Sequence, residues 1–370
     1  MTYNWQDPNW PNFIYQAEAF LPQTMDLIAK IGESLGASEV LKLNQKESLE
    51  LEFLVAEALK SAEIEGEYLS REDVYSSVRK EMGLPTSSSS KDQRAQGIAS
   101  LVVSVFRTFN DDLSKEMLFE WHAKMLSFQS RSISLGAWRK HHEPMQIVSG
   151  SAGREVVHFE APPSGQVGLE MDAFIRWFNA SAPGGSHDLK NPLIRAAISH
   201  IYFESIHPFE DGNGRIGRAL VEKALFQSFQ KPFLISWSKA LEHNKKYYYQ
   251  ALKSSQNGLD ITPWISFFFS SLDEALDDTK FHIQHIVWKA KLFDQFGTKL
   301  NKHQSKCLNK MMAFLPKEFE GGMTNKKYQS ITGVSKATAS RDLTELAMLG
   351  ILKKVGGGRS TAYQINNNAV

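Results

Sequence analysis

The sequence predicts a mostly α-helical protein with two β-hairpins and more than one hydrophobic core. Apolar residues recur every three or four positions through most of the 370-residue chain, which is typical of helices packed on one face. Two places break this pattern with short β-like runs around glycine-containing turns, within residues 145–160 and 351–365. A chain of this length, with 42% hydrophobic residues, has room for two or three domains.

The helical segments follow from the apolar spacing and from the residues that begin or end them. Ser70 is expected to be the N-cap of a helix with acidic residues in its first turn. Thr262 is expected to cap a helix with Pro263 in its first position, and Gly36 to end the first helix of the chain. The predicted helices cover 13–36, 45–65, 94–109, 114–128, 192–206, 215–229, 239–254, 262–296 and 302–315.

Composition divides the chain into three regions. The polar stretch PTSSSSKDQ at 85–93 separates an N-terminal helical region, 1–93, from a helical core, 94–298. The third region, 302–370, belongs to a strongly basic end. From Lys289 onward there are 14 Lys and Arg residues against 5 Asp and Glu, a formal charge of +9, whereas the rest of the chain carries −8. Such asymmetry often marks a nucleic-acid-facing end on an acidic body.

The composition also argues against several classes of protein. Cys307 is the only cysteine, so a disulfide framework and a cysteine metal site are excluded. The opening residues lack the pattern of a signal peptide, and apolar runs such as Trp264–Phe269 are too short to span a bilayer. We therefore expect a cytoplasmic protein with no membrane partner. Whether it is a monomer or a homodimer stays open.

Twelve residues at 207–218, HPFEDGNGRIGR, begin with a general base and a loop suited to anions. Pro208 cannot continue the preceding helix, which leaves His207 at its edge as an imidazole able to act as a base near neutral pH. A new helix then starts, and its free N–H groups favour negative charge. Its entry consists of residues that allow the backbone to approach a ligand closely: Gly212, Asn213 and Gly214.

The rest of the motif adds positive charge and a hard oxygen ligand. Arg215 and Arg218 are three residues apart on one helical face and suit phosphate oxygens. Asp211 offers a carboxylate suited to Mg²⁺ shared with those phosphates. A capped helix joint with surface arginines is the alternative, but it does not explain all these parts together. The combination predicts phosphoryl or nucleotidyl transfer.

This stretch resembles the signature HPFx[D/E]GNGRxxR of Fic-domain proteins at every specified position, and the similarity extends over about 111–271. The resemblance implies a Fic-type helical core that transfers AMP from ATP to a Tyr, Thr or Ser hydroxyl of a target protein, itself included. It implies that His207 deprotonates the hydroxyl and that Asp211 holds Mg²⁺. The residues implied to bind the ATP phosphates are Gly212, Asn213, Gly214, Arg215 and Arg218.

Two further segments are similar to substrate-binding parts of the Fic family. The hairpin before Pro162 and Pro163 resembles the Fic flap, which holds a target segment by backbone pairing; a purely structural hairpin is the alternative. Its working strand is placed at Val157, His158, Phe159 and Glu160. The segment NKKYYYQALKSSQ at 244–256 resembles the helix that lines the nucleotide pocket. The best matches are Tyr248, Tyr249 and Gln256, although the extra Tyr247 leaves the register open by one residue.

The segment SAEIEGE at 61–67 has two interpretations. By itself it is a helix end, with Ser61 and Glu65 on one face and Gly66 just after the cap. Beside a Fic core it matches the family's inhibitory motif, (S/T)xxxE(G/N). The resemblance implies that Glu65 pairs with Arg218, since one guanidinium cannot serve a carboxylate and a triphosphate at once. In some relatives this glutamate also positions water that removes AMP. The resemblance therefore also implies the reverse reaction, deAMPylation.

The basic end has the pattern of a winged helix-turn-helix. A short helix, a turn at Gly333 and a second helix capped by Ser335 precede the hairpin at 351–365. If this region binds DNA, the residues expected at the major groove are Ser335, Lys336, Thr338, Ser340 and Arg341. Those expected at phosphates are Lys353, Lys354 and Arg359. Winged helices also bind proteins, so both kinds of partner stay open.

The leading hypothesis is therefore a self-inhibited protein adenylyltransferase with a C-terminal winged helix. A rival hypothesis is a DNA-binding regulator whose Fic core senses nucleotide without turning it over. A third is a Fic enzyme that uses another nucleotide donor. The variant His207→Ala separates the first two, because it abolishes transfer and spares DNA binding, and a comparison of labelled ATP, GTP, CTP and UTP tests the third.

Overall fold

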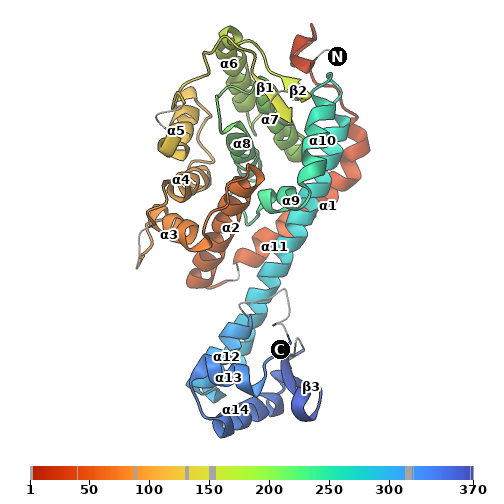
Figure 1. Cartoon of the computed structure of the whole chain (residues 1–370). Helices are drawn as coiled ribbons and strands as arrows, with labels where there is room; N and C mark the ends of the chain where they lie inside the picture. The colour runs from red at the N-terminus through yellow and green to blue at the C-terminus, as the bar shows by residue number, and fades with distance from the viewer. Residues whose placement is uncertain are drawn as a thin grey trace. The chain divides into compact units, whose positions relative to one another are not determined.

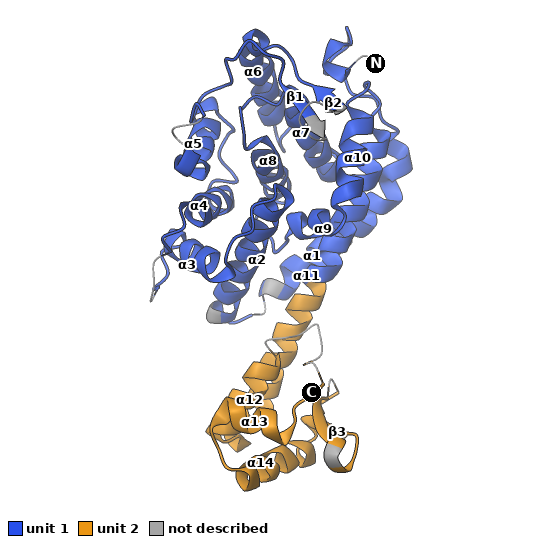
Figure 2. Cartoon of the chain, in the orientation of Figure 1, with its two compact units in different colours: residues 1–279 blue, residues 280–370 orange. Residues whose placement is uncertain are grey.

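A computed structural model of the chain describes residues 3–39, 41–86, 90–129, 133–149, 156–312, 319, 321–366 and 368–369. This part of the chain is mostly helical, with two short antiparallel hairpins, as the sequence predicted (Figure 1). It divides into two compact units, Met1–Thr279 and Lys280–Val370 (Figure 2). No helix in the described ranges is long and apolar enough to cross a membrane.

The first unit is built from helices around one hairpin. Its hairpin pairs β1 (Gln146–Ser149) with β2 (Val156–Glu160), with Ile147 opposite Phe159. The helices are α1 (Leu21–Glu39), α2 (Leu43–Ile64), α3 (Arg71–Glu81), α4 (Gln93–Arg107), α5 (Lys115–Met125), α6 (Ser164–Ala180), α7 (Pro192–Ile206), α8 (Asn213–Ser228), α9 (Trp237–His243) and α10 (Lys245–Ser255). Helix α11 (Thr262–Phe296) begins in this unit and ends in the next.

Two predicted helices differ from the observed ones. The first helix begins only at Leu21, after a 3-10 turn, and continues through Gly36 to Glu39. A single glycine costs a helix only about 1 kcal/mol, so Gly36 by itself does not end it. The helix predicted over 239–254 is broken at Asn244, whose side chain donates to the carbonyl of Ala240 and to the carboxylate of Glu274 and so competes with helical hydrogen bonding. Helix α6 was not predicted from the sequence.

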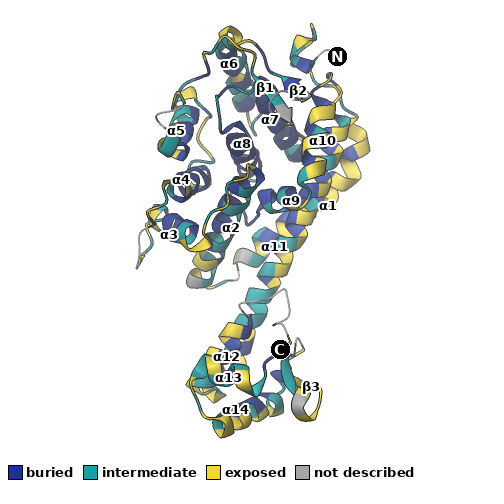
Figure 3. Ribbon diagram, in the orientation of Figure 1, coloured by how far each residue is buried: buried dark blue, intermediate teal, exposed yellow. Residues whose placement is uncertain are grey.

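Helices α7 and α8 form the centre of the first unit. Every residue of α7 from Leu193 to Ile206 is buried, as is almost all of α8, and the two helices pack against each other (Figure 3). Helices that are buried on every side, charged side chains such as Arg195 and Glu204 included, must be surrounded by other elements. The sharp joint between these two helices is residues 207–212, so the HPFEDGNGRIGR motif begins in the middle of the fold.

Helix α2 brings the N-terminal part of the chain to this centre. It packs on α3, α4, α8 and α9, and buries Val55, Ala58 and Ile64. These side chains belong to the same hydrophobic cluster as residues of α7, α8 and α11. The C-terminal end of α2, which carries Ser61 and Glu65, is thereby held next to α8.

The second unit has its own core and contains the predicted helix–turn–helix and hairpin. Its elements are α12 (Lys302–Met312), α13 (Asn325–Thr332), α14 (Lys336–Met348), β3 (Leu352–Val355) and β4 (Ala362–Ile365). Gly333 forms the turn with φ +76°, a conformation that favours glycine, and the Ser335 hydroxyl caps α14 by accepting from the Thr338 N–H. The core includes Leu308, Tyr328 and Leu343. Residues 313–315 of the predicted helix lie outside the described residues.

Candidate active site

The loop between α7 and α8 is held in an unusual backbone conformation. His207 ends α7 with φ 49° and ψ 61°, which is left-handed and costs a non-glycine residue about 1–3 kcal/mol. The Asn213 side chain clamps the loop, because its Oδ1 accepts from the Phe209 N–H and its Nδ2 donates to the Phe209 carbonyl, both at 2.9 Å. Gly212 has φ +82°, and a Cβ there would overlap Met125. The side chain of Asn213 therefore shapes the loop that was predicted to bind anions.

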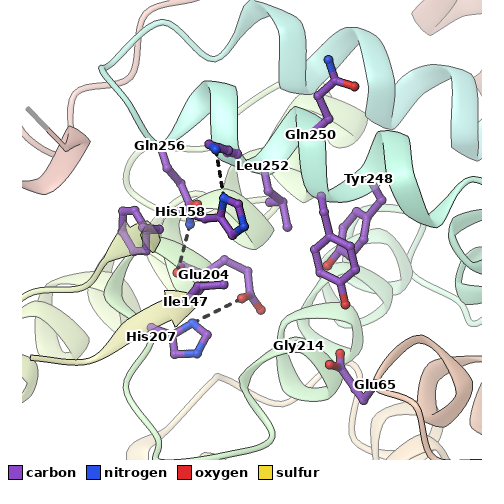
Figure 4. Close-up of a pocket in the computed structure, with 13 residues that line it drawn as sticks. Glu65, Ile147, His158, Glu204, His207, Gly214, Tyr248, Gln250, Leu252 and Gln256 are labelled. Carbon is purple, nitrogen blue, oxygen red and sulfur yellow. Dashed lines mark hydrogen bonds and ion pairs between the residues drawn. The ribbon is translucent and has the colours of Figure 1, made fainter. Parts of the chain in front are cut away.

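A cavity of about 630 Å³ opens beside this loop. It brings together many residues predicted from the sequence: Glu65, His158, Phe159, His207, Gly214, Tyr248, Tyr249 and Gln256 (Figure 4). Its lining also includes residues that the sequence did not single out: Ile147, Glu204, Gln250, Leu252 and Lys253. Segments far apart in the sequence, from α2, the hairpin, α7, α8 and α10, thus form one site.

Glu65 and Arg218 form the ion pair that the inhibitory motif implied. Glu65 Oε1 lies 2.8 Å from Arg218 Nη1, without hydrogen-bond alignment. Arg218 also donates from Nε to the Ser61 hydroxyl at 3.0 Å and from Nη2 to the Ser61 carbonyl at 2.8 Å. Burial alone would lower the pKa of Arg218, but the neighbouring Glu65 outweighs it and the net pKa is raised. The last arginine of the motif is fully charged and engaged by the end of α2.

Glycines make this pairing sterically possible. Gly66 adopts φ +82° just after the end of α2, as expected for a residue that follows a helix cap. A Cβ on Gly214 would overlap the Glu65 carboxylate in its present position, so glycine here leaves room for the carboxylate at the start of α8.

A second acid in the same segment holds the other arginine of the motif. Glu67 Oε1 lies 3.0 Å from Arg215 Nη1, and Arg215 Nη2 lies 3.3 Å from Asp211 Oδ1. The Arg215 side chain is only 3% exposed, so these carboxylates are its immediate electrostatic environment. Sequence reasoning missed Glu67, although its place two residues after Glu65 was a usable signal. Both phosphate-binding candidates on α8 are therefore paired with acids that follow α2.

Asp211 is the predicted magnesium ligand. Its side chain is 42% exposed, which leaves it open to solvent and ligands. Mg²⁺ usually takes one or two carboxylates and completes its coordination with water and substrate phosphates. The described residues contain no cluster of three His, Cys, Asp or Glu side chains able to hold a metal by themselves. A single carboxylate beside the predicted anion-binding loop therefore fits an ion that would arrive with a nucleotide.

His122 of α5 supports the loop from behind. Its ring stacks on Phe209 at 4.1 Å, and its Nδ1 accepts from the Gly136 N–H at 3.0 Å. Because Nδ1 is an acceptor, Nε2 carries the proton and donates to the Asp211 carbonyl at 3.2 Å. Burial lowers the pKa of His122, which keeps the ring neutral.

Arg139 ties the loop to the segment that leads from the hairpin into α6. Its guanidinium donates to the carbonyls of His207, at 2.8 Å, and of Pro162, and to the Ser164 hydroxyl at 3.0 Å. Burial lowers its pKa to about 10, so it stays charged at neutral pH. Like His122, it was missed, because its partners are distant in the sequence.

The hairpin and α10 form the other walls of the cavity. Phe159 is buried, Val157 is exposed, and His158 Nδ1 lies 2.9 Å from Lys253 Nζ of α10. Gln146 donates to the Glu160 carboxylate at 2.8 Å. Among the described residues β2 pairs with β1 alone, so its other edge has no strand partner, as a peptide-pairing edge requires.

The structure resolves the register of the tyrosine run. Tyr248 is buried with its hydroxyl 2.9 Å from His200 Nε2, Tyr249 lies at the cavity edge, and Tyr247 is 63% exposed. Tyr248 and Tyr249 are thus the two that line the cavity. Gln256 donates to the Glu204 carbonyl at 3.3 Å, which ties α10 to the last turn of α7.

A profile of the Fic/DOC family matches residues 112–225. Residues 112–225 are a Fic domain. A second profile, described as a domain of unknown function (DUF4172), matches residues 3–84, which include α2 and the predicted inhibitory segment at 61–67. The motif, its loop and most of α8 therefore lie within the Fic domain, whereas Glu65 and Glu67 come from the preceding one.

The Fic domain is similar in sequence to proteins named as adenylyltransferases. The chain is 30% identical over 138 residues to "Protein adenylyltransferase Fic" of Drosophila ananassae, which covers 37% of this chain and 26% of that protein. It is 28% identical over 185 residues to the protein of the same name from Drosophila persimilis, covering 49% and 34%. The chain spans about a quarter to a third of the length of these curated relatives.

Solved Fic structures share the fold. A Fic family protein from Desulfovibrio desulfuricans G20 matches with a TM-score of 0.54 and 20% identity, over 93% of this chain and 96% of that one. Fic-1 from C. elegans matches with a TM-score of 0.52 and 18% identity, over 72% and 74%. The predicted Fic-type helical core is confirmed.

Proposed function

We propose that this chain is a protein adenylyltransferase, which transfers AMP from ATP to a Tyr, Thr or Ser hydroxyl of a target protein, itself included. The observation that carries the proposal is one cavity that holds both His207 and the start of α8 at Gly214. The relatives named as adenylyltransferases support the same reaction and do not favour the rival hypothesis of a nucleotide sensor.

The proposed step uses His207 as the general base. The imidazole takes the proton of the target hydroxyl, whose oxygen attacks the α-phosphorus of ATP, and pyrophosphate leaves. The helix start at Gly214 and the guanidinium groups of Arg215 and Arg218 stabilise the phosphate charge. Asp211 would hold Mg²⁺, which supplies further charge neutralisation when bound.

The hairpin and α10 supply the remaining contacts in this proposal. The edge of β2, with Val157, His158, Phe159 and Glu160, holds the target segment by backbone pairing. The adenosine end packs against Tyr248 and Tyr249, with Gln256 as a hydrogen-bonding group. Such contacts place the target hydroxyl in line with the α-phosphate without reading much of the target's sequence.

The resting site is inhibited in this proposal by its own N-terminal domain. Arg218 is ion-paired with Glu65 and hydrogen-bonded to Ser61, so the γ-phosphate cannot take the same guanidinium without displacing the carboxylate. Glu65 is 29% exposed, which leaves it free to move away when inhibition is relieved. The reverse removal of AMP, with Glu65 positioning water, belongs to the same proposal.

The test is self-labelling with radiolabelled ATP. We expect Glu65→Gly to raise the labelling rate by about 100-fold, because it frees an arginine worth about 10²–10³ in rate when it holds transition-state charge. Adding His207→Ala to that variant should abolish labelling, and GTP, CTP and UTP should label less than ATP. Unchanged labelling in Glu65→Gly would contradict the inhibitory role, and labelling that survives His207→Ala would contradict the mechanism.

We also propose that residues 302–370 form a winged-helix domain that contacts DNA, following an N-terminal region 1–93 and a core 94–298. Two expected groove contacts, Lys336 and Arg341, and the phosphate contacts Lys353 and Lys354 are exposed. The side chain of Arg359 lies outside the described part of the structure. A cytoplasmic location and homodimerisation stay predictions.

A further inference from the structure

Glu204 is a buried carboxylate one turn before His207 on α7. Its Oε2 lies 3.6 Å from His207 Nδ1 (Figure 4). The left-handed backbone of His207 ends the helix at this point and is compatible with a ring folded back over the last turn of α7. The two side chains are only 5% and 13% exposed, so this contact is shielded from water.

The ring nitrogen in this contact has no hydrogen bond. His207 Nδ1 is fully buried, and within the described part of the chain no hydrogen bond reaches it; the second carboxylate oxygen of Glu204, Oε1, which is not the one nearest the ring, is also buried without a hydrogen bond. A buried polar atom left without a partner costs about 1–3 kcal/mol, so a close pairing of these groups during turnover is favoured. Hydrogen bonds in unliganded active sites are often long and shorten when substrate binds.

The carboxylate is held in place from the opposite side by α8. A Cβ on Gly217 would overlap Glu204 Oε1, so the glycine at this position leaves the space that the carboxylate occupies. Burial would raise the pKa of Glu204, but His207, with His200 and Arg218, outweighs burial, and the net pKa is lowered. Glu204 is therefore ionised beside the ring.

We propose that Glu204 is a positioning residue for the base: it accepts the Nδ1 proton of His207 and leaves the Nε2 lone pair for the target hydroxyl. This inference rests on the proposed function. The hydroxyl O–H bond breaks and its proton goes to Nε2, while the oxygen forms a bond to the α-phosphorus of ATP and the bond to pyrophosphate breaks. The imidazolium so formed keeps its Nδ1 proton toward the Glu204 carboxylate, which offsets its charge. The Nε2 proton is later released to solvent.

The first readout is the tautomer of His207, which needs no turnover. Long-range ¹H–¹⁵N correlation spectra of histidine-labelled Glu65→Gly protein, assigned with His207→Ala, should show the proton on Nδ1. In Glu204→Gln the neutral ring should lose this single tautomer, because an amide can donate to Nδ1 as well as accept from it. A proton on Nε2 in the Glu65→Gly protein, or an unchanged tautomer in Glu204→Gln, would overturn the inference.

The second readout is kinetic. In the Glu65→Gly background, Glu204→Gln should lower kcat by about 100-fold and leave the KM for ATP within about threefold, since a misoriented base is lost at the proton-transfer step. Glu204→Asp, which keeps the charge, should recover part of kcat, and Gly217→Ala should lower kcat by pushing the carboxylate away. A kcat of Glu204→Gln within threefold of its parent would contradict the positioning role.

Two controls separate the possible failures. Glu210→Gln removes a carboxylate three residues after His207 that accepts from the Ser134 N–H, and it should leave the tautomer and kcat unchanged. If the Glu65→Gly protein transfers no nucleotide at all, the proposed function fails, and the tautomer spectra still decide whether Glu204 holds the ring. A merely structural role for Glu204 predicts a lower Tm in Glu204→Gln with the tautomer preserved.

Discussion

The arginines of the Fic signature and the basic residues of the second unit carry the same charge in opposite environments. Arg215 and Arg218 are 3% and 1% exposed, and each lies within 3.0 Å of a carboxylate. Arg341 is 68% exposed, and its nearest acids, Asp342 and Glu345, lie 4.0 and 3.8 Å away. The positive charges of Arg215 and Arg218 are paired with particular carboxylates, whereas that of Arg341 is exposed to solvent.

This difference in burial and pairing limits what each site can recognise. A buried guanidinium must be paired, because an unpaired buried charge costs several kcal/mol, so its partner can only be exchanged for another anion of fitting shape. An exposed charge interacts weakly with any single neighbour and acts through a field screened within about 10 Å at 0.1 M salt. We therefore expect function in the Fic domain to depend mainly on the geometry of its arginine contacts. Binding by the second unit should depend mainly on the number of its positive charges.

The largest expected effect comes from replacing a buried, ion-paired guanidinium by an ammonium group. Arg218→Lys in the Glu65→Gly background should lower kcat for self-labelling by about 100-fold, because lysine cannot reproduce the planar fork that holds two oxygens at once. Single-turnover labelling with radiolabelled ATP measures it. Arg341→Lys in the same background is the matched control and should label at the parent rate. Equal labelling rates for Arg218→Lys and its parent would contradict the expected difference between the buried and the exposed arginines.

A smaller effect is expected for an exposed charge. If the second unit binds DNA, Arg341→Ala should weaken binding several-fold and reduce the slope of log affinity against log salt by about 1, since one phosphate contact is lost. Arg341→Lys should keep the wild-type slope. Mobility shifts at several salt concentrations measure both. No shift of wild-type protein at low salt, or a slope lowered equally by both variants, would count against this proposal.

The smallest expected effect concerns the second acid of the inhibitory segment. Glu67→Gln in the Glu65→Gly background should raise labelling about threefold, because Arg215 is then released from a carboxylate but keeps Asp211 at 3.3 Å. Glu67→Gln alone should change little while Glu65 still holds Arg218. An increase in the single variant as large as that of Glu65→Gly would mean that Glu67, rather than Glu65, is the main restraint.

Local features of the fold could be predicted well from the sequence. The caps at Ser70 and Ser335, the turn at Gly333 and the two hairpins all depend on residues within a few positions of one another. The break at Asn244 could not be predicted, because its amide bonds Glu274, thirty residues away, as well as Ala240. Local propensity carries no information about such a partner.

The candidate site divides in the same way. The sequence by itself determined which residues could serve as base, anion-binding loop and metal ligand, because HPFEDGNGRIGR contains them in twelve consecutive positions. The pairing of Glu65 with Arg218 was also predicted, through a resemblance between motifs. Only the tertiary structure decided how these groups are held: Arg139 on the His207 carbonyl, Glu67 on Arg215, and the Glu204 carboxylate in the space left by Gly217. The physical reason is that burial gives each charged group few partners, and which partners those are depends on how α2, α7 and α8 pack.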